Sequence, residues 1–202
     1  MNTKNKFKII AISRQFGSGG RTIGKLLAEQ LNIPLYDREI ISQVAKESGF
    51  AESYVEEKGE YGSSDKAAGM FINRSCYSSA SNEDTIWNFQ TKFIKEHAEK
   101  EPCVIIGRCA DYILRNRPDV LRVFIHADME ERIKRITEVY KINDSAPEKL
   151  LHQKDKRRAA YYQFYTDIKW GDTKNFHITL DSSAFGIEKC VQILKTLYLG
   201  EK

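Results

Sequence analysis

The sequence predicts an α/β protein in which helices cover a mainly parallel sheet. The first observation is an almost continuously apolar segment at residues 7–13, the composition of a strand buried on both faces. The second is that three later segments of the same kind alternate with helical patterns. The third is a glycine-rich turn that joins the first strand to the first helix, as at the start of a βα unit.

A chain of 202 residues is long enough to bury a sizeable core, and we expect a single domain over residues 1–202. The net charge of +4 is too small to indicate a nucleic-acid-binding protein, but it allows a local basic site for an anionic ligand. No apolar run approaches the roughly 20 residues of a membrane span. Four scattered cysteines favour reduced thiols. We expect a cytoplasmic protein, a monomer or a homodimer, with no nucleic-acid partner and no membrane partner.

The elements of the first half follow from spacing and from turn residues. A helix is predicted at residues 21–31, where apolar side chains recur at helical spacing before Pro34. Residues 33–36 are predicted as a very short strand. Asp37 is a plausible N-cap for the next helix, which ends near Gly49.

The composition changes at residues 59–82, which contain three glycines and many serines. We interpret this stretch as an excursion from the layered fold with one short helix. A helical turn at residues 54–58 precedes it, and a helix at residues 84–100 follows it.

In the second half, the patterns predict strands at residues 103–106, 121–126 and 176–181 and helices at residues 111–117, 129–139, 148–165 and 187–199.

The sharpest chemical feature is the loop at residues 16–22, between the first strand and the first helix. Main-chain N–H groups of such a turn converge on an anion, and the helix N-terminus adds the positive end of its dipole. The hydroxyl of Thr22 suits a Mg²⁺ ion held by the same phosphates. The predicted phosphate-binding residues are Gly17, Ser18, Gly19, Gly20, Arg21 and Thr22.

The loop departs from the G-x-x-x-x-G-K-[ST] pattern. With Gly20-Arg21-Thr22 in the place of Gly-Lys-Thr, Gln15 stands where the leading glycine belongs. The alternative alignment puts Gly20 in the place of the lysine. Arg21 is the nearest cation for the role of the lysine, and Lys25 is a weaker candidate. A glycine-rich turn without a ligand is the other interpretation.

A second basic group is expected at the same edge of the sheet. Arg108 follows a buried strand, and ligands of open α/β sheets bind at the carboxyl ends of strands. Arg132 and Arg135 share one side of a helix, and Lys154, Arg157 and Arg158 share one side of the long basic helix. We expect at least two of these helical cations to contact phosphate, although charge runs are often solvated faces or local ion pairs.

The sequence allows more than one role for two acidic residues and for one aromatic stretch. Asp37 is a candidate for a metal or a ribose hydroxyl, and equally for a helix cap. Asp111 is a candidate carboxylate beside the metal or as a base. The aromatic residues at 161–165 and Trp170 could stack on a nucleobase, but such a stripe is more often core.

Four stretches together resemble the cytidylate kinase-like family of nucleoside monophosphate kinases, in its divergent bacterial branch. They are AISRQFGSGGRTIGKLLAEQL (residues 11–31) with YDREII (36–41), VIIGRCADYIL (104–114), VFIHADMEERIKRI (123–136), and KDKRRAAYYQFYT (154–166) with WGD (170–172) and FHITLDSS (176–183).

The resemblance implies a three-layer P-loop kinase fold with a helical acceptor-binding insertion at about residues 38–100 and a lid-like region at about residues 141–172. It implies transfer of a phosphoryl group from ATP, with Mg²⁺, to a nucleoside monophosphate such as CMP or dCMP. The implied catalytic residues are Arg21, Arg108, Arg132, Arg157 and Arg158, and the implied substrate-binding residues are Asp37, Arg108 and Asp111.

The chain departs from the family pattern at two places. The family has a Gly-Lys-Gly-Thr loop and a Gly-Arg-Asp triplet, whereas here the lysine is absent and Cys109 stands where the aspartate belongs. Two alternatives therefore remain: a P-loop kinase for another small-molecule acceptor, and a nucleotide-binding regulator with little turnover.

Overall fold

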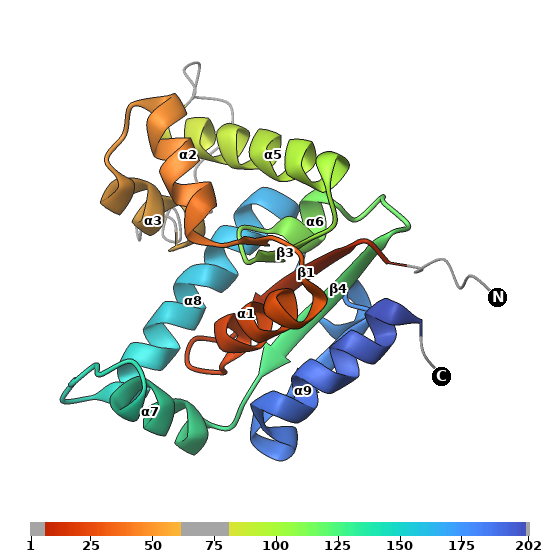
Figure 1. The fold of residues 1–202 in the computed structure, drawn as a ribbon. Coiled ribbons are helices and arrows are strands. Elements are labelled where there is room, and N and C mark those ends of the chain that lie inside the picture. Colours follow the sequence, from red (N-terminus) through yellow and green to blue (C-terminus); the bar gives the residue numbers. More distant parts are fainter. Residues whose placement is uncertain (1–6, 62–80, 201–202) are drawn as a thin grey trace.

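The computed structural model describes residues 7–61 and 81–200 (Figure 1). Its strands are β1 (Ile9–Arg14), β2 (Leu35–Tyr36), β3 (Cys103–Ile106), β4 (Val120–His126) and β5 (Ile178–Asp181). Its helices are α1 (Gly20–Leu31), α2 (Arg38–Ser48), α3 (Glu52–Tyr61), α5 (Asn82–Lys100), α6 (Ala110–Ile113), α7 (Met129–Glu138), α8 (Pro147–Thr166), the short 3₁₀ helix η2 (Thr173–Asn175) and α9 (Ser182–Leu199).

The five strands form one sheet in the order β2-β3-β1-β4-β5, and every neighbouring pair is parallel. This arrangement confirms the predicted α/β class with a parallel sheet. β1 lies at the centre, so the loop that follows it leaves the middle of the carboxyl edge. In such sheets ligands bind at that edge, because the loops there surround a crevice.

Alternate side chains of β1 enter two different cores. Ile10 and Ile12 pack with α1 and α9 on one face of the sheet, where these two helices lie together in Figure 1. Ile9 and Ala11 pack with α2 and α5 on the other face. The strand is therefore buried on both faces, which explains its continuous run of apolar residues.

Several boundaries differ from the predicted ones. α6 spans four residues, because after Ile113 the chain closes into turns with Arg115 N–H donating to the Tyr112 carbonyl. α9 begins at Ser182, since the Asp181 carboxylate accepts hydrogen bonds from the first main-chain N–H groups of the helix. The regular helical geometry is then interrupted at Gly186, at φ 74°.

The predicted excursion at residues 59–82 is wrong at its start, because residues 59–61 belong to α3. The predicted short helix in that stretch falls on residues 62–80, which lie outside the described residues. α5 begins with Ser81 as N-cap, where the Ser81 hydroxyl and the Asp84 carboxylate form a reciprocal capping box.

Within residues 7–61 and 81–200, no helix combines the length and the apolar character of a membrane span. The same residues contain no group of three or more side chains arranged to ligate a metal ion. Cys103, Cys109 and Cys190 are buried free thiols.

Candidate functional site

The loop between β1 and α1 is built around glycines with left-handed torsions. Gly17 has φ 81° and Gly19 has φ 76°, a region that side chains rarely adopt. A Cβ atom on Gly19 would collide with Ile187 Cδ1 and lie 3.2 Å from the guanidinium carbon of Arg135. The glycines therefore allow the loop to fold tightly while Arg135 lies against it.

Side chains from two later helices fix the loop. The Ser182 hydroxyl, at the start of α9, donates to the Ser18 carbonyl at 2.6 Å. The Arg132 Nε group of α7 donates to the Phe16 carbonyl at 2.8 Å, and Arg132 is almost fully buried. These contacts come from residues more than 100 positions away, so the loop is held by the tertiary fold.

A carboxylate already occupies one main-chain donor of the loop. The Phe16 N–H group donates to Asp155 Oδ1 of α8 at 2.8 Å. The same carboxylate is ion-paired with Arg132, and its Oδ1 atom lies 3.7 Å from Arg158 Nη1. The loop thus contains an N–H group that donates to an anionic oxygen, which is the property a phosphate-binding loop requires.

Arg108 lies in a strained turn after β3. Gly107, Arg108 and Cys109 have φ 69°, 56° and 56°. Non-glycine residues in this region cost about 1–2 kcal/mol each, so two in succession store strain that the surrounding structure must hold. The turn buries the Arg108 side chain, whose Nη1 atom lies 3.4 Å from Gln90 Oε1 of α5.

Three arginines surround one buried glutamate beside the loop. Glu60, in the last turn of α3, is ion-paired with Arg14 at the end of β1, and its Oε1 atom lies 3.3 Å from Arg158 Nε. Burial by itself would raise the pKa of the Glu60 carboxyl. The charges of Arg14, Arg158 and Arg108 outweigh burial and hold that pKa well below its usual range. We call Arg14, Arg108 and Arg158 the arginine cluster.

Asp111 lies behind the cluster. Its two carboxylate oxygens accept hydrogen bonds from the Ser13 hydroxyl at 2.9 Å and the Tyr162 hydroxyl at 2.6 Å. Burial raises the pKa of Asp111, and the hydrogen bonds from Tyr162 and Ser13 counter part of that rise. Burial, and then the Asp111 carboxylate, raise the pKa of Tyr162. The contacts that the structure gives to Asp111 suit a residue that positions β1 and α8.

Arg21 and Asp37 form an ion pair at the first turn of α1, with 2.5 Å between Arg21 Nε and Asp37 Oδ2. Asp37 stands at the N-cap position of α2, but its side chain accepts no capping hydrogen bond. The interpretation of Asp37 as a side-chain cap is therefore wrong, because the arginine takes its carboxylate. Thr22 lies in the same turn of α1 and is partly exposed.

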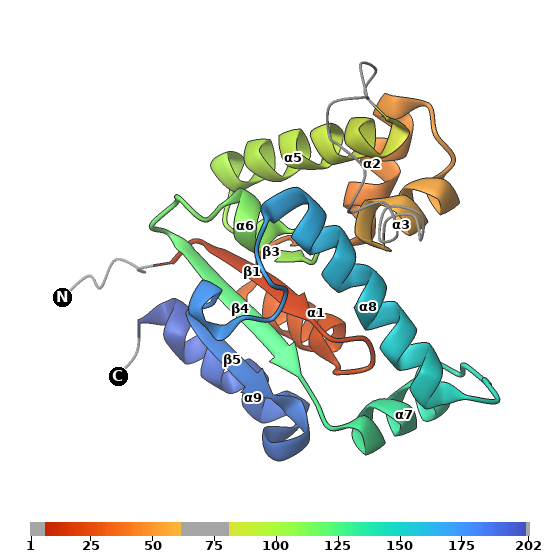
Figure 2. The same cartoon turned by 180° about the vertical axis from the view of Figure 1, so that it is seen from behind.

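The long basic helix α8 passes beside α3 and reaches α7 (Figure 2). Arg157 of α8 is ion-paired with Glu57 of α3 at 3.1 Å. Burial, and then the positive charges of Arg157 and Arg158, lower the pKa of Lys154. This helix therefore presents cations to both α3 and the loop.

The aromatic residues that follow the cations are mostly core. Tyr161 and Tyr162 are buried, and Tyr165 stacks on Trp87 of α5 with 4.3 Å between ring centroids. Phe164 is exposed. These contacts favour the packing interpretation over stacking on a nucleobase.

A hollow of about 460 Å³ connects the loop with α3 and α8. It is lined by Arg14, Gln15, Phe16, Gly17, Gly19, Gly20, Arg21, Ser53, Glu56, Glu57, Glu60, Tyr140, Ile142, Lys154 and Arg158. Its volume is in the range of small-molecule sites, and it joins the predicted phosphate loop to the arginine cluster.

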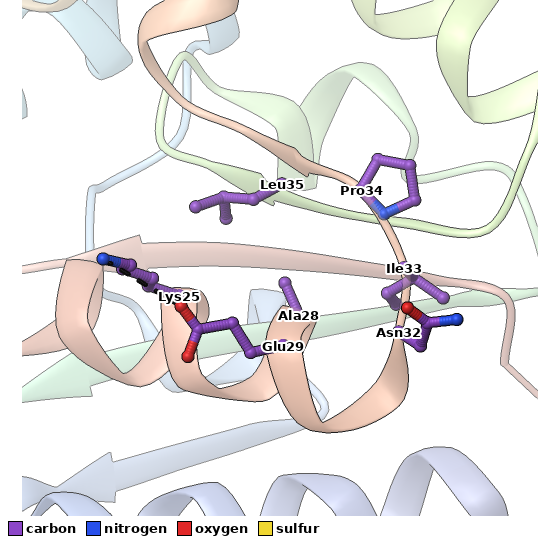
Figure 3. A pocket seen from close by; sticks show the side chains of 7 residues that line it. All are labelled: Lys25, Ala28, Glu29, Asn32, Ile33, Pro34 and Leu35. Carbon is purple, nitrogen blue, oxygen red and sulfur yellow. Dashed lines mark ion pairs between the residues drawn. The ribbon is translucent and has the colours of Figure 1, made fainter.

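Another hollow, of about 430 Å³, lies along α1 toward its C-terminal end (Figure 3). Its only charged lining residues are Lys25 and Glu29, which pair with each other at 3.9 Å. It holds no convergent set of polar groups, so we assign the candidate site to the loop.

The structure thus brings together the loop, Arg108, Arg132 and Arg158, and it places Arg21 with Asp37 and Arg157 with Glu57. Sequence reasoning missed Arg14, Glu60 and Asp155 as site residues. A charged residue at the end of an otherwise apolar strand was the available signal for Arg14. Nothing in the pattern of α3 distinguishes Glu60 from the glutamates at its surface.

Known proteins show the same family and the same fold. The family model of the cytidylate kinase-like family matches residues 9–184. The chain is 28% identical over 189 residues to the cytidylate kinase of Methanosarcina barkeri (strain Fusaro / DSM 804), which covers 92% of this chain and 93% of that protein. It is 29% identical over 189 residues to the cytidylate kinase of Archaeoglobus fulgidus, and the match covers 92% of this chain and 91% of that protein.

Among solved structures, an uncharacterized protein from Eubacterium ventriosum ATCC 27560 is similar with a TM-score of 0.71 and 29% identity, over 96% of this chain and 99% of that one. The shikimate kinase from Acinetobacter baumannii in complex with shikimate has a TM-score of 0.56 and 17% identity, and the match covers 98% of this chain and 96% of that one. The latter likeness concerns the fold alone, and it agrees with the predicted P-loop kinase fold.

Proposed function

The chain belongs to the cytidylate kinase-like family and is a phosphotransferase, and from this premise we propose that it transfers the terminal phosphoryl group of ATP to CMP or dCMP. The family and its curated relatives named cytidylate kinase support a nucleoside monophosphate as acceptor. The observation that carries the proposal is the arginine cluster beside the phosphate loop, at the carboxyl edge of the sheet.

On the donor side, residues 17–22 bind the phosphates of ATP through main-chain N–H groups at the start of α1. The contact of Phe16 N–H with the Asp155 carboxylate supports this role, because an anionic oxygen is already the partner of a loop amide. Arg132 keeps the loop in shape from behind through the Phe16 carbonyl. Thr22 is the residue that would hold Mg²⁺ bound to the nucleotide, and the ion supplies charge neutralisation to the phosphates when bound.

On the acceptor side, Arg108 and Arg158 bind the phosphate of the monophosphate and stabilise the charge that develops during transfer. Arg21 lines the hollow from α1, and Asp37 orients Arg21 through their ion pair. Arg157 of α8 pairs with Glu57, which lines the same hollow. Asp111 fixes Ser13 and Tyr162 beneath the site. Catalysis consists of positioning and electrostatics, as in other phosphoryl transfers.

We assign the acceptor-binding insertion to about residues 38–100, which include α2, α3 and α5, and the lid to about residues 141–172, which include α8. The pairing of Arg157 with Glu57 supports this assignment, because it joins α8 of the one region to α3 of the other.

A phosphotransfer assay tests the proposal. Purified protein is given ATP and Mg²⁺ with CMP, dCMP, UMP, AMP, GMP or non-nucleotide acceptors, and products are separated by chromatography. The expected result is CDP or dCDP as the main product. Product from a different acceptor overturns the cytidine assignment and favours another small-molecule kinase. ATP binding without product from any acceptor overturns the enzymatic proposal and favours a nucleotide-binding regulator.

A further inference from the structure

The acceptor side of the site is filled by a side chain of the protein itself. Glu60 lies between Arg14 and Arg158, is ion-paired with both, and is 8% exposed. The remaining cavity at the cluster measures about 20 Å³, room for about one water molecule. A phosphate group does not fit into this cavity while Glu60 stays in place, and Glu60 stands between it and the hollow of about 460 Å³ because it lines both.

The backbone is built to bring Glu60 into this position. The preceding residue is Gly59, and a Cβ atom there would lie 2.6 Å from Arg108 Nη1. A Cβ atom on Gly107 would lie 2.8 Å from Glu60 Oε1. Two glycines therefore let α3 approach the turn after β3 closely enough for the carboxylate to enter the cluster.

The charges favour an exchange. The three guanidiniums repel one another, and Glu60 offsets one of their three positive charges. The Asp155 carboxylate lies 3.7 Å from Arg158 Nη1, but it is shared with Arg132. A phosphate monoester at neutral pH carries close to two negative charges and offers three oxygens to the same donors. A phosphate group is therefore the better counter-ion. Glu60 is a weaker counter-ion, but it is part of the chain and needs no binding step.

We propose that Glu60 occupies the phosphate position of the acceptor in the unliganded enzyme and must leave the arginine cluster before an acceptor binds. This inference rests on the proposed function for the identity of the acceptor, but its chemistry requires only a phosphate monoester or phosphate ion. Glu60 keeps the like-charged arginines assembled in the absence of substrate. It also lowers the affinity for the acceptor by competing with it.

The test measures binding of inorganic phosphate, and separately of CMP, by isothermal titration calorimetry without ATP. Glu60→Gln keeps the shape of the side chain and removes its charge. The expected result is that Glu60→Gln binds phosphate at least fivefold more tightly than the unmodified protein. The matched control is Glu52→Gln, which removes an exposed charge from the first turn of the same helix and is expected to change nothing.

A double variant locates the effect, because phosphate also binds to the loop. In an Arg108→Gln background, Glu60→Gln is expected to give a gain of less than twofold. Equal or weaker phosphate binding by Glu60→Gln overturns the proposal, and so does a full gain without Arg108. If Glu60→Gln does not fold, Glu60→Asp applies the same test, because the shorter carboxylate retreats from the cluster. A phosphate gain with no CMP binding by any variant leaves the role of Glu60 standing and refutes cytidylate as the acceptor.

Discussion

The two halves of the candidate site differ in the groups that form them: main-chain groups at the loop, and charged side chains at the arginine cluster. On the loop side, the proposed anion site consists of main-chain N–H groups, Gly17 and Gly19 have left-handed torsions, and the hollow beside the loop measures about 460 Å³. On the other side, the charged side chains of the arginine cluster crowd around Glu60 and leave about 20 Å³. Main-chain dipoles carry no net charge, and in the loop one N–H group, that of Phe16, is already paired with the Asp155 carboxylate. Converging guanidiniums repel one another and need a resident anion.

The largest expected effect comes from the side-chain half. Replacing Arg108 by Ala removes a buried cation that would contact the acceptor's phosphate. We expect kcat/KM for the acceptor to fall about a hundredfold, the size seen when one stabilising donor is removed from an active site. Steady-state kinetics with varied acceptor measure it. Arg115→Ala, an exposed arginine just after α6, is the matched control with unchanged kinetics. A change confined to the KM for ATP would place Arg108 on the donor side and break the comparison.

The next effect concerns the main-chain half. Gly19→Ala forces a side chain into a left-handed torsion and against Ile187 and Arg135. We expect ATP affinity to fall about thirtyfold, equal to about 2 kcal/mol, as measured by equilibrium binding. Gly49→Ala is the matched control, because Gly49 has φ 75° and a Cβ atom added there would meet nothing within 4 Å. It carries the same torsional cost, so equal ATP affinities in both variants would show that the loop geometry is not what binds phosphate.

A smaller effect is expected at the missing lysine. Arg21→Ala should lower turnover about tenfold while the circular dichroism spectrum stays unchanged, because Arg21 lies in the first turn of α1 and pairs with Asp37. Lys25→Ala is measured beside it. The opposite ranking, with Lys25→Ala impaired and Arg21→Ala normal, would show that Lys25, one turn further along α1, replaces the missing lysine.

The smallest effect near neutral pH concerns stability. The pKa of Glu60 is depressed in the folded protein, so its stabilising effect is complete above the unfolded value of about 4.5 and is lost as the pH falls below it. For each pH unit between the unfolded-state and folded-state pKa of Glu60, this group lowers the free energy of unfolding by up to about 1.4 kcal/mol as the pH falls. Urea unfolding between pH 7 and pH 3 should therefore show a steeper loss for the unmodified protein than for Glu60→Gln. Parallel curves would contradict the pairing with the cluster.

The glycine-rich loop of the proposed site could be predicted from the sequence, and most of the side chains that the structure gathers around Glu60 could not. A buried apolar strand, glycines and a helical pattern lie next to one another in residues 7–31, so the loop can be predicted from neighbouring residues alone. Arg108 was found because it directly follows a buried strand. Arg14 and Glu60 are 46 positions apart, and their pairing depends on where α3 packs. Hydrophobic periodicity carries no information about which glutamate of a charged helix turns inward.

The same limit explains the differences in the fold. The parallel sheet and most of its strands follow from runs of apolar residues, which tertiary packing reinforces, whereas the strand order β2-β3-β1-β4-β5 comes from the structure alone. The short α6 and the early start of α9 depend on individual hydrogen bonds, such as those of Asp181, that outweigh the apolar pattern.

The hydrogen bond from Phe16 N–H to Asp155 has a spectroscopic consequence. It joins the loop to α8 through one amide proton, and on the proposed function a bound phosphate would compete with the carboxylate for the same region. The solvent-exchange rate and the nitrogen-15 chemical shift of that single amide therefore report how often α8 separates from the loop. For the lid proposed above, one backbone resonance at residue 16 would follow its opening and closing.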